Sequence, residues 1–210
     1  MRQTVTSLTL LAVTFAAAPL RAEGPAFNCA KADGEVEELI CQDEGLAALD
    51  RKLDEVYKAA LDKAKNEVPP VLKAEQRGWI KGRNECWKAT GADNPAFLTA
   101  SWQATSVRDC VEGQYRLRIS ELQARYRLVP MKGPVFYACE NNPANEIVAT
   151  YFETDPPTAQ VERGDRAATV WLVPAGSGSK YEGQNLELWT KGDEATVTWL
   201  DEEMTCKVKT

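Results

Sequence analysis

Histidine is absent from this chain of 210 residues. Without it, neither a Ser–His nor a Cys–His nucleophile pair is possible. The sequence also lacks a Cys-x-x-Cys motif. It therefore has no obvious set of zinc ligands, because zinc binds clustered Cys and His side chains. No glycine motif that would cradle a phosphate is present. We therefore predict a protein that is not an enzyme and that binds no metal and no other cofactor.

Two catalytic arrangements need no histidine. Ser177 and Lys180 have the spacing that places both side chains on one helical turn, but they lie in a glycine-rich turn, which disfavours a helix. A pair of carboxylates can hydrolyse glycosides. The acidic clusters Asp193-Glu194 and Asp201-Glu202-Glu203 are more typical of solvated strand ends than of a catalytic pair. Neither arrangement therefore predicts an enzyme.

Long apolar runs are also scarce. The candidate run is Leu8–Ala18, which follows the basic Arg2 and precedes a candidate cleavage point after Ala22. This order is typical of a secretory signal peptide, and the run is too short to span a bilayer; a buried core helix is the alternative. The first cysteine, Cys29, does not directly follow the run, so no lipid anchor is expected. We predict a signal peptide over residues 1–22 and a soluble periplasmic protein without a membrane anchor.

Basic residues are outnumbered, with 25 Lys and Arg against 31 Asp and Glu, which gives a net charge of −6. The first 22 residues carry +2, so the remainder carries −8, divided into −2 on residues 23–130 and −6 on residues 131–210. Such an acidic protein is a poor ligand for nucleic acid or for an anionic membrane. Its field favours a basic partner, although acidity also serves simply to keep an exported protein in solution.

Six cysteines, an even number in an exported chain, indicate three disulfides. Their spacing favours pairing in sequence order, namely Cys29–Cys41, Cys86–Cys110 and Cys139–Cys206. Other connectivities are open to six cysteines, so this pairing is a hypothesis.

The first half of the chain has helical periodicity. One apolar stripe follows a plausible N-cap, Asp43, and Pro69-Pro70 is expected to end that helix. The three stripes consist of Leu46, Leu49, Leu53, Val56, Tyr57, Ala60, Leu61 and Ala64; of Leu72, Trp79, Arg83 and Cys86; and of Val107, Val111, Tyr115, Leu122 and Tyr126. We expect the aromatic residues to be core, and Arg83 to pack against a helix end or a carboxylate. Residues 23–130 are thus predicted to form a small disulfide-linked three-helix domain.

After Pro134 the pattern changes to short stretches rich in Val, Ile, Thr and aromatic residues, separated by turn residues. The expected strands are Val135–Cys139, Ile147–Phe152, Thr158–Glu162, Ala167–Val173, Leu186–Thr190, Thr196–Leu200 and Met204–Val208. Seven or eight short strands suggest an antiparallel barrel or sandwich over residues 131–210. The chain as a whole is predicted to be an α+β protein of two domains.

Two segments between these strands are unusual. Pro174–Tyr181 contains two Gly and two Ser, so its backbone is able to approach another surface closely. Trp189–Ala195 has the pattern of a strand, a tight turn at Lys191-Gly192-Asp193 and a returning strand. Taken alone, the first is typical of a flexible connector and the second of a solvated hairpin.

These segments carry a family resemblance. The last 75 or so residues resemble the MliC and PliC inhibitors of c-type lysozyme, found in the envelope of Gram-negative bacteria. The matching marks are Tyr137-Ala138-Cys139, the loop Ser177–Tyr181, the hairpin Trp189–Ala195, and Cys206. The resemblance implies a small antiparallel β-barrel closed by a Cys139–Cys206 disulfide. It also implies a c-type lysozyme as the partner.

The same resemblance implies a mechanism. The Gly/Ser loop of the family enters the active-site cleft of lysozyme, where its Ser contacts the catalytic carboxylates, and peptidoglycan hydrolysis is blocked. Ser177 matches that Ser, and Lys191 matches the functional Lys of the hairpin. The remaining expected partner-binding residues are Gly178, Ser179, Lys180 and Tyr181, the last as a candidate anchor. Ser179 stands where the family commonly has Ala, which adds a hydroxyl to the loop.

Residues 27–122 resemble the helical domain of LprI-type exported proteins, some of which are described as lysozyme inhibitors. The matching marks are Cys29, Glu38–Cys41, Leu49-Asp50, Leu53, Tyr57, Gln76-Arg77, Trp79, Arg83-Asn84, Cys86, Cys110, Tyr115 and Arg118-Ile119. We assign no partner-binding residue to this half. The sequence thus predicts a lysozyme inhibitor. The alternative is an envelope interaction module that does not inhibit c-type lysozyme.

Overall fold

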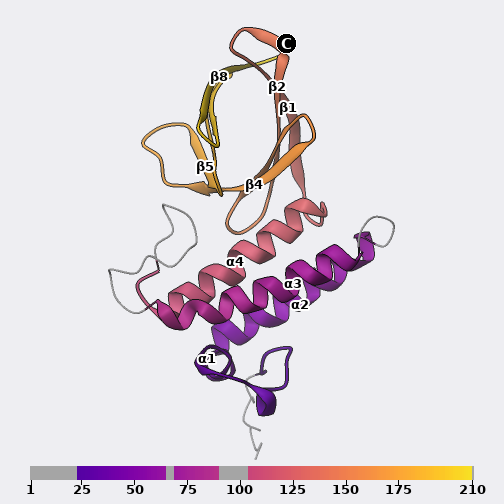
Figure 1. Cartoon of the computed structure of the whole chain (residues 1–210), viewed down its shortest axis with the longest axis vertical. Helices are drawn as coiled ribbons and strands as arrows, with labels where there is room; N and C mark the ends of the chain where they lie inside the picture. The colour runs from indigo at the N-terminus through magenta and orange to yellow at the C-terminus, as the bar shows by residue number, and fades with distance from the viewer. Residues whose placement is uncertain (1–22, 65–68, 90–103, 210) are drawn as a thin grey trace, which may run out of the picture.

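The computed structural model describes residues 23–64, 69–89 and 104–209. The predicted signal peptide, residues 1–22, and its cleavage point after Ala22 lie outside the described residues. Within the described ranges, no helix combines the length and the apolar character that crossing a membrane requires. A helical bundle and a closed β-barrel follow one another along the long axis of the molecule (Figure 1).

The helical half contains four α-helices among the described residues. They are α1 (Glu35–Gln42), α2 (Glu44–Lys63), α3 (Pro69–Asn84) and α4 (Val107–Arg125), accompanied by the short 3-10 turns η1 (Cys29–Lys31) and η3 (Glu85–Lys88). Helices α2, α3 and α4 correspond to the three predicted stripes. Helix α1 is an additional short helix.

Helix α2 begins where its sequence predicts. The Asp43 side chain accepts a hydrogen bond from the Leu46 backbone N–H at 2.9 Å, which satisfies one of the free donors of the first turn. The helix ends at Lys63, and Pro69-Pro70 starts α3 instead of ending α2. A proline suits a first turn because its missing N–H would have no helical partner there. The predicted stripe forms the buried face of α2, with Leu46, Leu53, Val56 and Ala60.

Asp43 provides a test of this helix start. Arg108 Nε donates to Asp43 Oδ2 at 2.8 Å, and this bond, followed by the Leu46 N–H, lowers the pKa of the Asp43 carboxyl. Because the folded pKa lies below the unfolded one, the ionised carboxylate stabilises the fold above about pH 4, and that contribution is lost as the pH falls through the folded pKa. We expect Asp43→Asn, which keeps a cap acceptor, to lower the free energy of unfolding by about 0.5–1 kcal/mol at neutral pH and by less at low pH.

Urea unfolding at pH 7 and at pH 2.5 measures this difference. Asp54→Asn is the matched control, because it removes an exposed carboxylate paired with Lys58 on the same helix. Its effect should stay below about 0.5 kcal/mol. A gap between the parent and Asp43→Asn that keeps its size at low pH would contradict the assigned role of Asp43.

A buried polar cluster joins the four helices. Arg83, on α3, is 3% exposed; its Nη1 donates to Tyr115 Oη of α4 at 2.6 Å, and its Nη2 to Glu37 Oε1 of α1 at 3.3 Å. Tyr115 Oη donates in turn to Asp50 Oδ1 of α2 at 2.7 Å. The Trp79 and Tyr115 rings meet edge to face, with centroids 5.3 Å apart. The predicted contact of Arg83 with a carboxylate and the predicted core position of Tyr115 are therefore confirmed.

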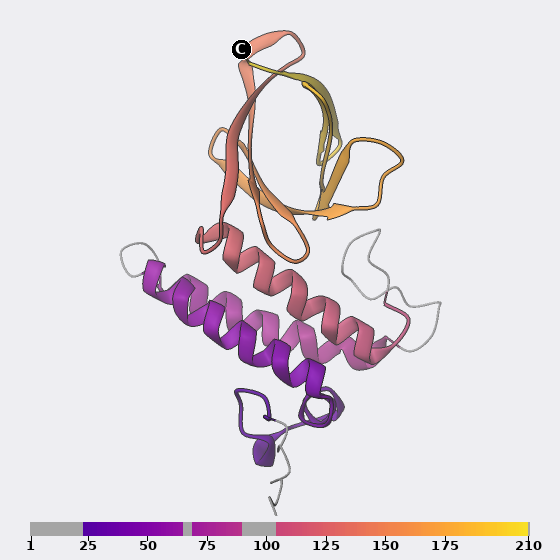
Figure 2. The ribbon, with the colours of Figure 1, turned by 180° about the vertical axis from the view of Figure 1, so that it is seen from behind.

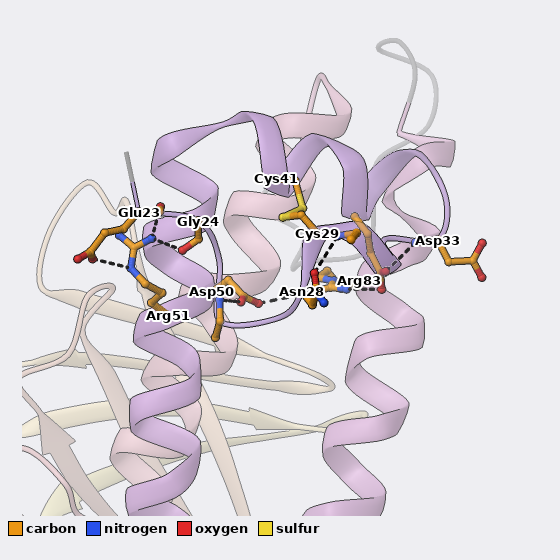
Figure 3. The surroundings of a disulfide bond; sticks show 12 residues. Glu23, Gly24, Asn28, Cys29, Asp33, Cys41, Asp50, Arg51 and Arg83 are labelled. Atoms are coloured by element: carbon orange, nitrogen blue, oxygen red, sulfur yellow. Dashed lines mark hydrogen bonds and ion pairs between the residues drawn. A yellow bond between two sulfur atoms is a disulfide. The ribbon is translucent and has the colours of Figure 1, made fainter. Parts of the chain in front are cut away.

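The chain before α1 is fastened to the bundle by covalent and polar contacts (Figure 3). Cys29 and Cys41 form a disulfide with their Cα atoms 5.9 Å apart. The Ala26 backbone N–H donates to Asp50 Oδ2 at 2.8 Å. Arg51 Nη1 donates, at 2.6 Å each, to the carbonyl oxygens of Glu23 and Gly24. The carboxylate of Asp50 therefore links this segment to the Arg83 cluster.

Helix α4 lies between the barrel and the other helices, as both views show (Figures 1 and 2). On its barrel side, Ser120 Oγ accepts a hydrogen bond from Trp171 Nε1 at 2.8 Å. Arg116 Nη1 lies 2.7 Å from Asp155 Oδ2 in the loop between the second and third strands. One helix thus belongs to the helical core and also carries the polar contacts that hold the barrel against it.

Eight antiparallel strands close into a barrel in sequence order. They are β1 (Met131–Cys139), β2 (Asn142–Phe152), β3 (Thr158–Arg163), β4 (Arg166–Val173), β5 (Ser179–Gly183), β6 (Leu186–Lys191), β7 (Glu194–Trp199) and β8 (Glu202–Val208). Pairing of β1 with β8 closes the barrel, and Cys139 and Cys206 face each other in that pair. The barrel interior is filled by inward-facing side chains that include Ile147, Val161, Val170, Leu188, Val197 and Met204. The predicted fold class is confirmed.

The cysteine pairs in the structure are the three that the spacing favoured. Cys86–Cys110 joins η3 to α4, and Cys139–Cys206 joins the first and last strands of the barrel, 67 positions apart in the chain. Together with Cys29–Cys41 they leave no free cysteine. Each half of the molecule is therefore cross-linked by its own cysteines, and such cross-links stabilise small domains whose cores are limited.

Strand β5 is the strand that the sequence pattern does not show. It spans five residues, Ser179–Gly183, of which Tyr181 alone is buried. A strand this short, with Ser, Lys, Glu and Gly at the other positions, has little intrinsic β preference. Its conformation is imposed by pairing with β4 on one side and β6 on the other. The predicted Pro174–Tyr181 loop is accordingly shorter than expected and ends at Gly178.

Candidate functional site

The two unusual segments of the sequence lie side by side at one end of the barrel. The loop Pro174–Gly178 connects β4 to β5, and Gly192-Asp193 connects β6 to β7. Because β5 pairs with β6, Ser179 stands opposite Thr190, at the base of both connections. The barrel thus brings together two segments that are separated by a whole hairpin in the chain.

Gly178 forms the closest contact between them. Its φ of +67° lies in the left-handed region of backbone conformations, which residues other than glycine rarely adopt. A Cβ at this position would lie 2.2 Å from the Thr190 carbonyl oxygen and 3.3 Å from Lys191 Cβ. The loop backbone therefore rests directly on β6, and no larger residue fits between them. This explains why glycine is needed here, whereas Gly176 has open space around it.

Two hydrogen bonds hold the loop in this position. Trp189 Nε1 donates to the Ser177 carbonyl oxygen at 2.8 Å, and Thr190 Oγ1 donates to the Ser179 carbonyl oxygen at 3.3 Å. Sequence reasoning included Trp189 in the hairpin but gave it no role. Its position two residues before Lys191 places both side chains on the same face of the strand, because alternate residues of a strand share a face. This spacing could have indicated that Trp189 belongs to the site.

Ser177 and Lys191 present free polar groups to solvent. Both residues are exposed, and neither Ser177 Oγ nor Lys191 Nζ has a hydrogen-bond or ion-pair partner within the described residues. The other four lysines of the described barrel, Lys132, Lys180, Lys207 and Lys209, each have a carboxylate within 4.0 Å. Glu194, which stands opposite Lys191 in the hairpin, lies 3.3 Å from Lys207 Nζ. The ammonium of Lys191 is thus available to an outside partner.

Lys180 differs from Lys191 although both were expected to bind a partner. Its Nζ lies 2.9 Å from Glu187 Oε2 and 3.1 Å from Glu182 Oε1. The hydrogen bond to Glu187, followed by that to Glu182, raises the pKa of the Lys180 ammonium. A partner carboxylate would have to compete with two carboxylates of the barrel, so Lys180 stabilises the strand pair instead of offering a free charge.

Tyr181, the expected candidate anchor for a partner, is buried in the structure. It belongs to the barrel core, and its ring centroid lies 5.6 Å from that of Tyr151. Strand alternation accounts for this position, because Tyr181 follows the outward-facing Lys180 and must point inward. Burial raises the pKa of the Tyr181 hydroxyl, in keeping with its position.

Ser179 is the first residue of β5 and is half-buried. Its carbonyl takes part in the loop contacts described above, but its hydroxyl has no partner among the described residues. The hydroxyl that distinguishes this chain from the common Ala of the resembling family therefore changes nothing in the fold of the loop.

The described residues contain no group of three or more His, Cys, Asp or Glu side chains placed to hold a metal ion. The Ser177–Lys180 pair does not form a nucleophile and base either, since Lys180 Nζ is engaged by Glu182 of β5 and Glu187 of β6. Among the described residues, the site thus consists of a shaped loop, the free hydroxyls of Ser177 and Ser179, and the free ammonium of Lys191.

Two family models match successive parts of the chain. Residues 137–205 match a model described as membrane-bound lysozyme-inhibitor of c-type lysozyme (MliC), and residues 28–122 match one described as lysozyme inhibitor LprI. The first range contains the whole candidate site. Both resemblances inferred from sequence motifs are confirmed.

Similar proteins are found in mycobacteria. The chain is 26% identical over 185 residues to Lipoprotein LprI of Mycobacterium tuberculosis and of Mycobacterium bovis, covering 88% of this chain and 84% of each relative. Among solved structures, it is 28% identical to Pseudomonas aeruginosa MliC in a crystal structure in complex with hen egg white lysozyme. That match covers 39% of this chain and 86% of the other, with a TM-score of 0.33.

Proposed function

Because the helical half and the barrel each match a family of lysozyme inhibitors, we propose that this protein inhibits a c-type lysozyme and is not an enzyme. The proposal assigns the inhibitory contact to the barrel. The loop Pro174–Gly178 enters the active-site cleft of the lysozyme and blocks access of peptidoglycan. The observation that carries the proposal is that Ser177 and Lys191, whose side-chain polar groups have no partner among the described residues, lie on two segments in direct contact at one end of the barrel.

The chemistry of a lysozyme active site suits these two groups. Such a site holds one carboxylic acid and one carboxylate. A serine hydroxyl donates a hydrogen bond to a carboxylate and accepts one from a carboxylic acid, so Ser177 serves either form. The Lys191 ammonium adds a charge that the carboxylate attracts, and both interactions strengthen as the loop displaces water from the cleft.

Long-range electrostatics favour the same partner. Residues 131–210 carry a net charge of −6, whereas the tip of the loop pair carries the free Lys191 ammonium. An acidic body attracts a basic protein and speeds the encounter. The Lys191 ammonium then pairs with a carboxylate in the cleft of that basic partner. This combination supports a specific orientation in the complex.

The chain is organised in three parts. Residues 1–22 act as a signal peptide, residues 23–130 form the helical LprI-like domain, and residues 131–210 form the inhibitory barrel. The mature protein acts in the periplasm, where its three disulfides are stable. The helical domain supports the barrel through α4, by the Trp171–Ser120 and Arg116–Asp155 contacts.

Titration of a c-type lysozyme with the oxidised mature protein tests the function directly. With the enzyme on a suspension of cell walls, we expect residual activity to fall in proportion to added protein and to end near one equivalent. Lys132→Ala is the control variant, because it removes an exposed barrel lysine that pairs with Glu153 and lies outside the loop pair. It should inhibit as the parent does. Full enzyme activity at excess parent protein would refute the proposal in favour of an envelope interaction module.

A further inference from the structure

Trp189 is an exposed aromatic residue beside the loop. This residue is 41% exposed, whereas tryptophan is highly buried on average. It lies on β6 two residues before Lys191, and alternation along the strand places both side chains on the outer face. The neighbouring inward-facing Leu188 is fully buried. The outer face of β6 therefore presents an apolar surface next to the free ammonium.

The indole of Trp189 is held in place before any partner arrives. Its Nε1 donates to the Ser177 carbonyl oxygen, so the polar edge of the ring is occupied and the loop is tied to the ring. Lys180 and Thr196 flank it on the two neighbouring strands. A side chain fixed in this way loses little conformational freedom on binding. Tryptophan with its polar edge satisfied and its face exposed is also the residue type most often found at the energetic centre of interfaces.

We infer that Trp189 is the apolar contact residue of the inhibitory site, and that its ring packs against the rim of the lysozyme cleft while Ser177 enters it. This inference rests on the proposed function and adds a residue to it. It replaces Tyr181, which the barrel core buries, with a residue on the same face as Lys191. The hydrogen bond to the Ser177 carbonyl gives Trp189 a second role, since it sets the position of the inserted loop.

Two substitutions distinguish the apolar contact of Trp189 from its hydrogen bond to the loop. Trp189→Ala removes the contact and the N–H donor, whereas Trp189→Phe keeps most of the apolar contact and removes the donor. We expect the inhibition constant of Trp189→Ala to rise at least about 30-fold, as for a central interface residue, and that of Trp189→Phe to rise by less. Phe136→Ala, which removes an exposed aromatic side chain from β1, is the matched control and should leave inhibition unchanged. Thermal unfolding of each variant checks that the barrel remains folded.

A spectroscopic measurement reports on the contact without relying on the activity of the variants. With 5-fluorotryptophan incorporated into the otherwise unchanged protein, the fluorine resonance of position 189 is identified by its absence in Trp189→Phe. We expect this resonance to shift, and to lose its solvent isotope effect, when lysozyme is added. The resonance of Trp171, whose Nε1 bonds to Ser120 under the barrel, should not move.

The outcomes separate this inference from the proposed function. A parent protein that does not inhibit lysozyme overturns the proposed function. A parent that inhibits, together with a Trp189→Ala variant within about 3-fold of it or an unshifted resonance at position 189, overturns the inference alone. Equal weakening by alanine and phenylalanine would also overturn it, because Trp189 would then act only through its N–H.

Discussion

Replacing Ser177 and Lys191 together with alanine is expected to weaken lysozyme inhibition by about 10²–10⁴-fold while leaving the fold unchanged. Each side chain is proposed to make one hydrogen bond that involves a charged group, and such a bond contributes about 1.5–3 kcal/mol. Two of them amount to about 3–6 kcal/mol, which corresponds to that factor in affinity. Stability should not suffer, since neither side-chain polar group has a partner within the described part of the barrel.

The measurement is the dissociation constant of the lysozyme complex for the parent, for each single variant and for the double variant. Single replacements should each cost about 10- to 100-fold. Because the two groups address carboxylates of one cleft, their effects should couple, and the double-mutant cycle measures that coupling. Lys132→Ala, which changes an exposed barrel lysine outside the loop pair, is the control variant and should bind as the parent does. A double variant that binds as tightly as the parent would contradict the proposed roles of both residues.

Removal of the Arg83 guanidinium should have the largest effect on stability. In Arg83→Met the apolar part of the side chain is kept, but Glu37 and Asp50 lose their cation, and Tyr115 Oη loses a donor. Arg83 is 3% exposed, so these groups cannot turn to water without disturbing the bundle. Breaking a buried ion pair by removing one partner costs about 3–5 kcal/mol, and we expect a loss in this range.

Urea unfolding followed by circular dichroism at the helical wavelengths measures this loss. Arg125→Met is the matched control, because Arg125 is a half-exposed arginine on α4 that pairs with Glu75 on α3. Its removal should cost less than about 1 kcal/mol. A loss of less than about 1 kcal/mol for Arg83→Met would show that the buried cluster contributes orientation without net stability. Either way, binding of lysozyme by the folded barrel should be unchanged, since no residue of the cluster lies near the loop pair.

Local features of the sequence predicted the helical half well. The start of α2 depends on Asp43 and the residues that follow it, and a capping interaction of this kind operates within one turn of the helix. The apolar stripes depend on the helical repeat, which is also local. The role of Pro69-Pro70 was misjudged for the same reason, because a proline pair is compatible with both the end of one helix and the start of the next.

The barrel was harder to predict in one place. Seven strands carry enough Val, Ile, Thr and aromatic residues to be recognised, but β5 does not. Its five residues become a strand because β4 and β6 present unpaired edges on either side of them. The same error extended the Gly/Ser loop to Tyr181, which belongs to the barrel core.

The sequence by itself determined the class of this protein. Its lack of histidine excluded the common nucleophilic triads, its cysteine spacing favoured the disulfide pairs that the structure contains, and its motifs pointed to two families of lysozyme inhibitors. Only the tertiary structure decided which side chains of the two motifs are free to act. Lys180 and Lys191 are both lysines close to acidic residues in the chain, but Lys180 Nζ is held by Glu182 of its own strand and by Glu187 of the paired strand β6. The contact with Glu187 follows from strand pairing, which places residues of neighbouring strands side by side, and so it cannot be read from chain neighbours alone.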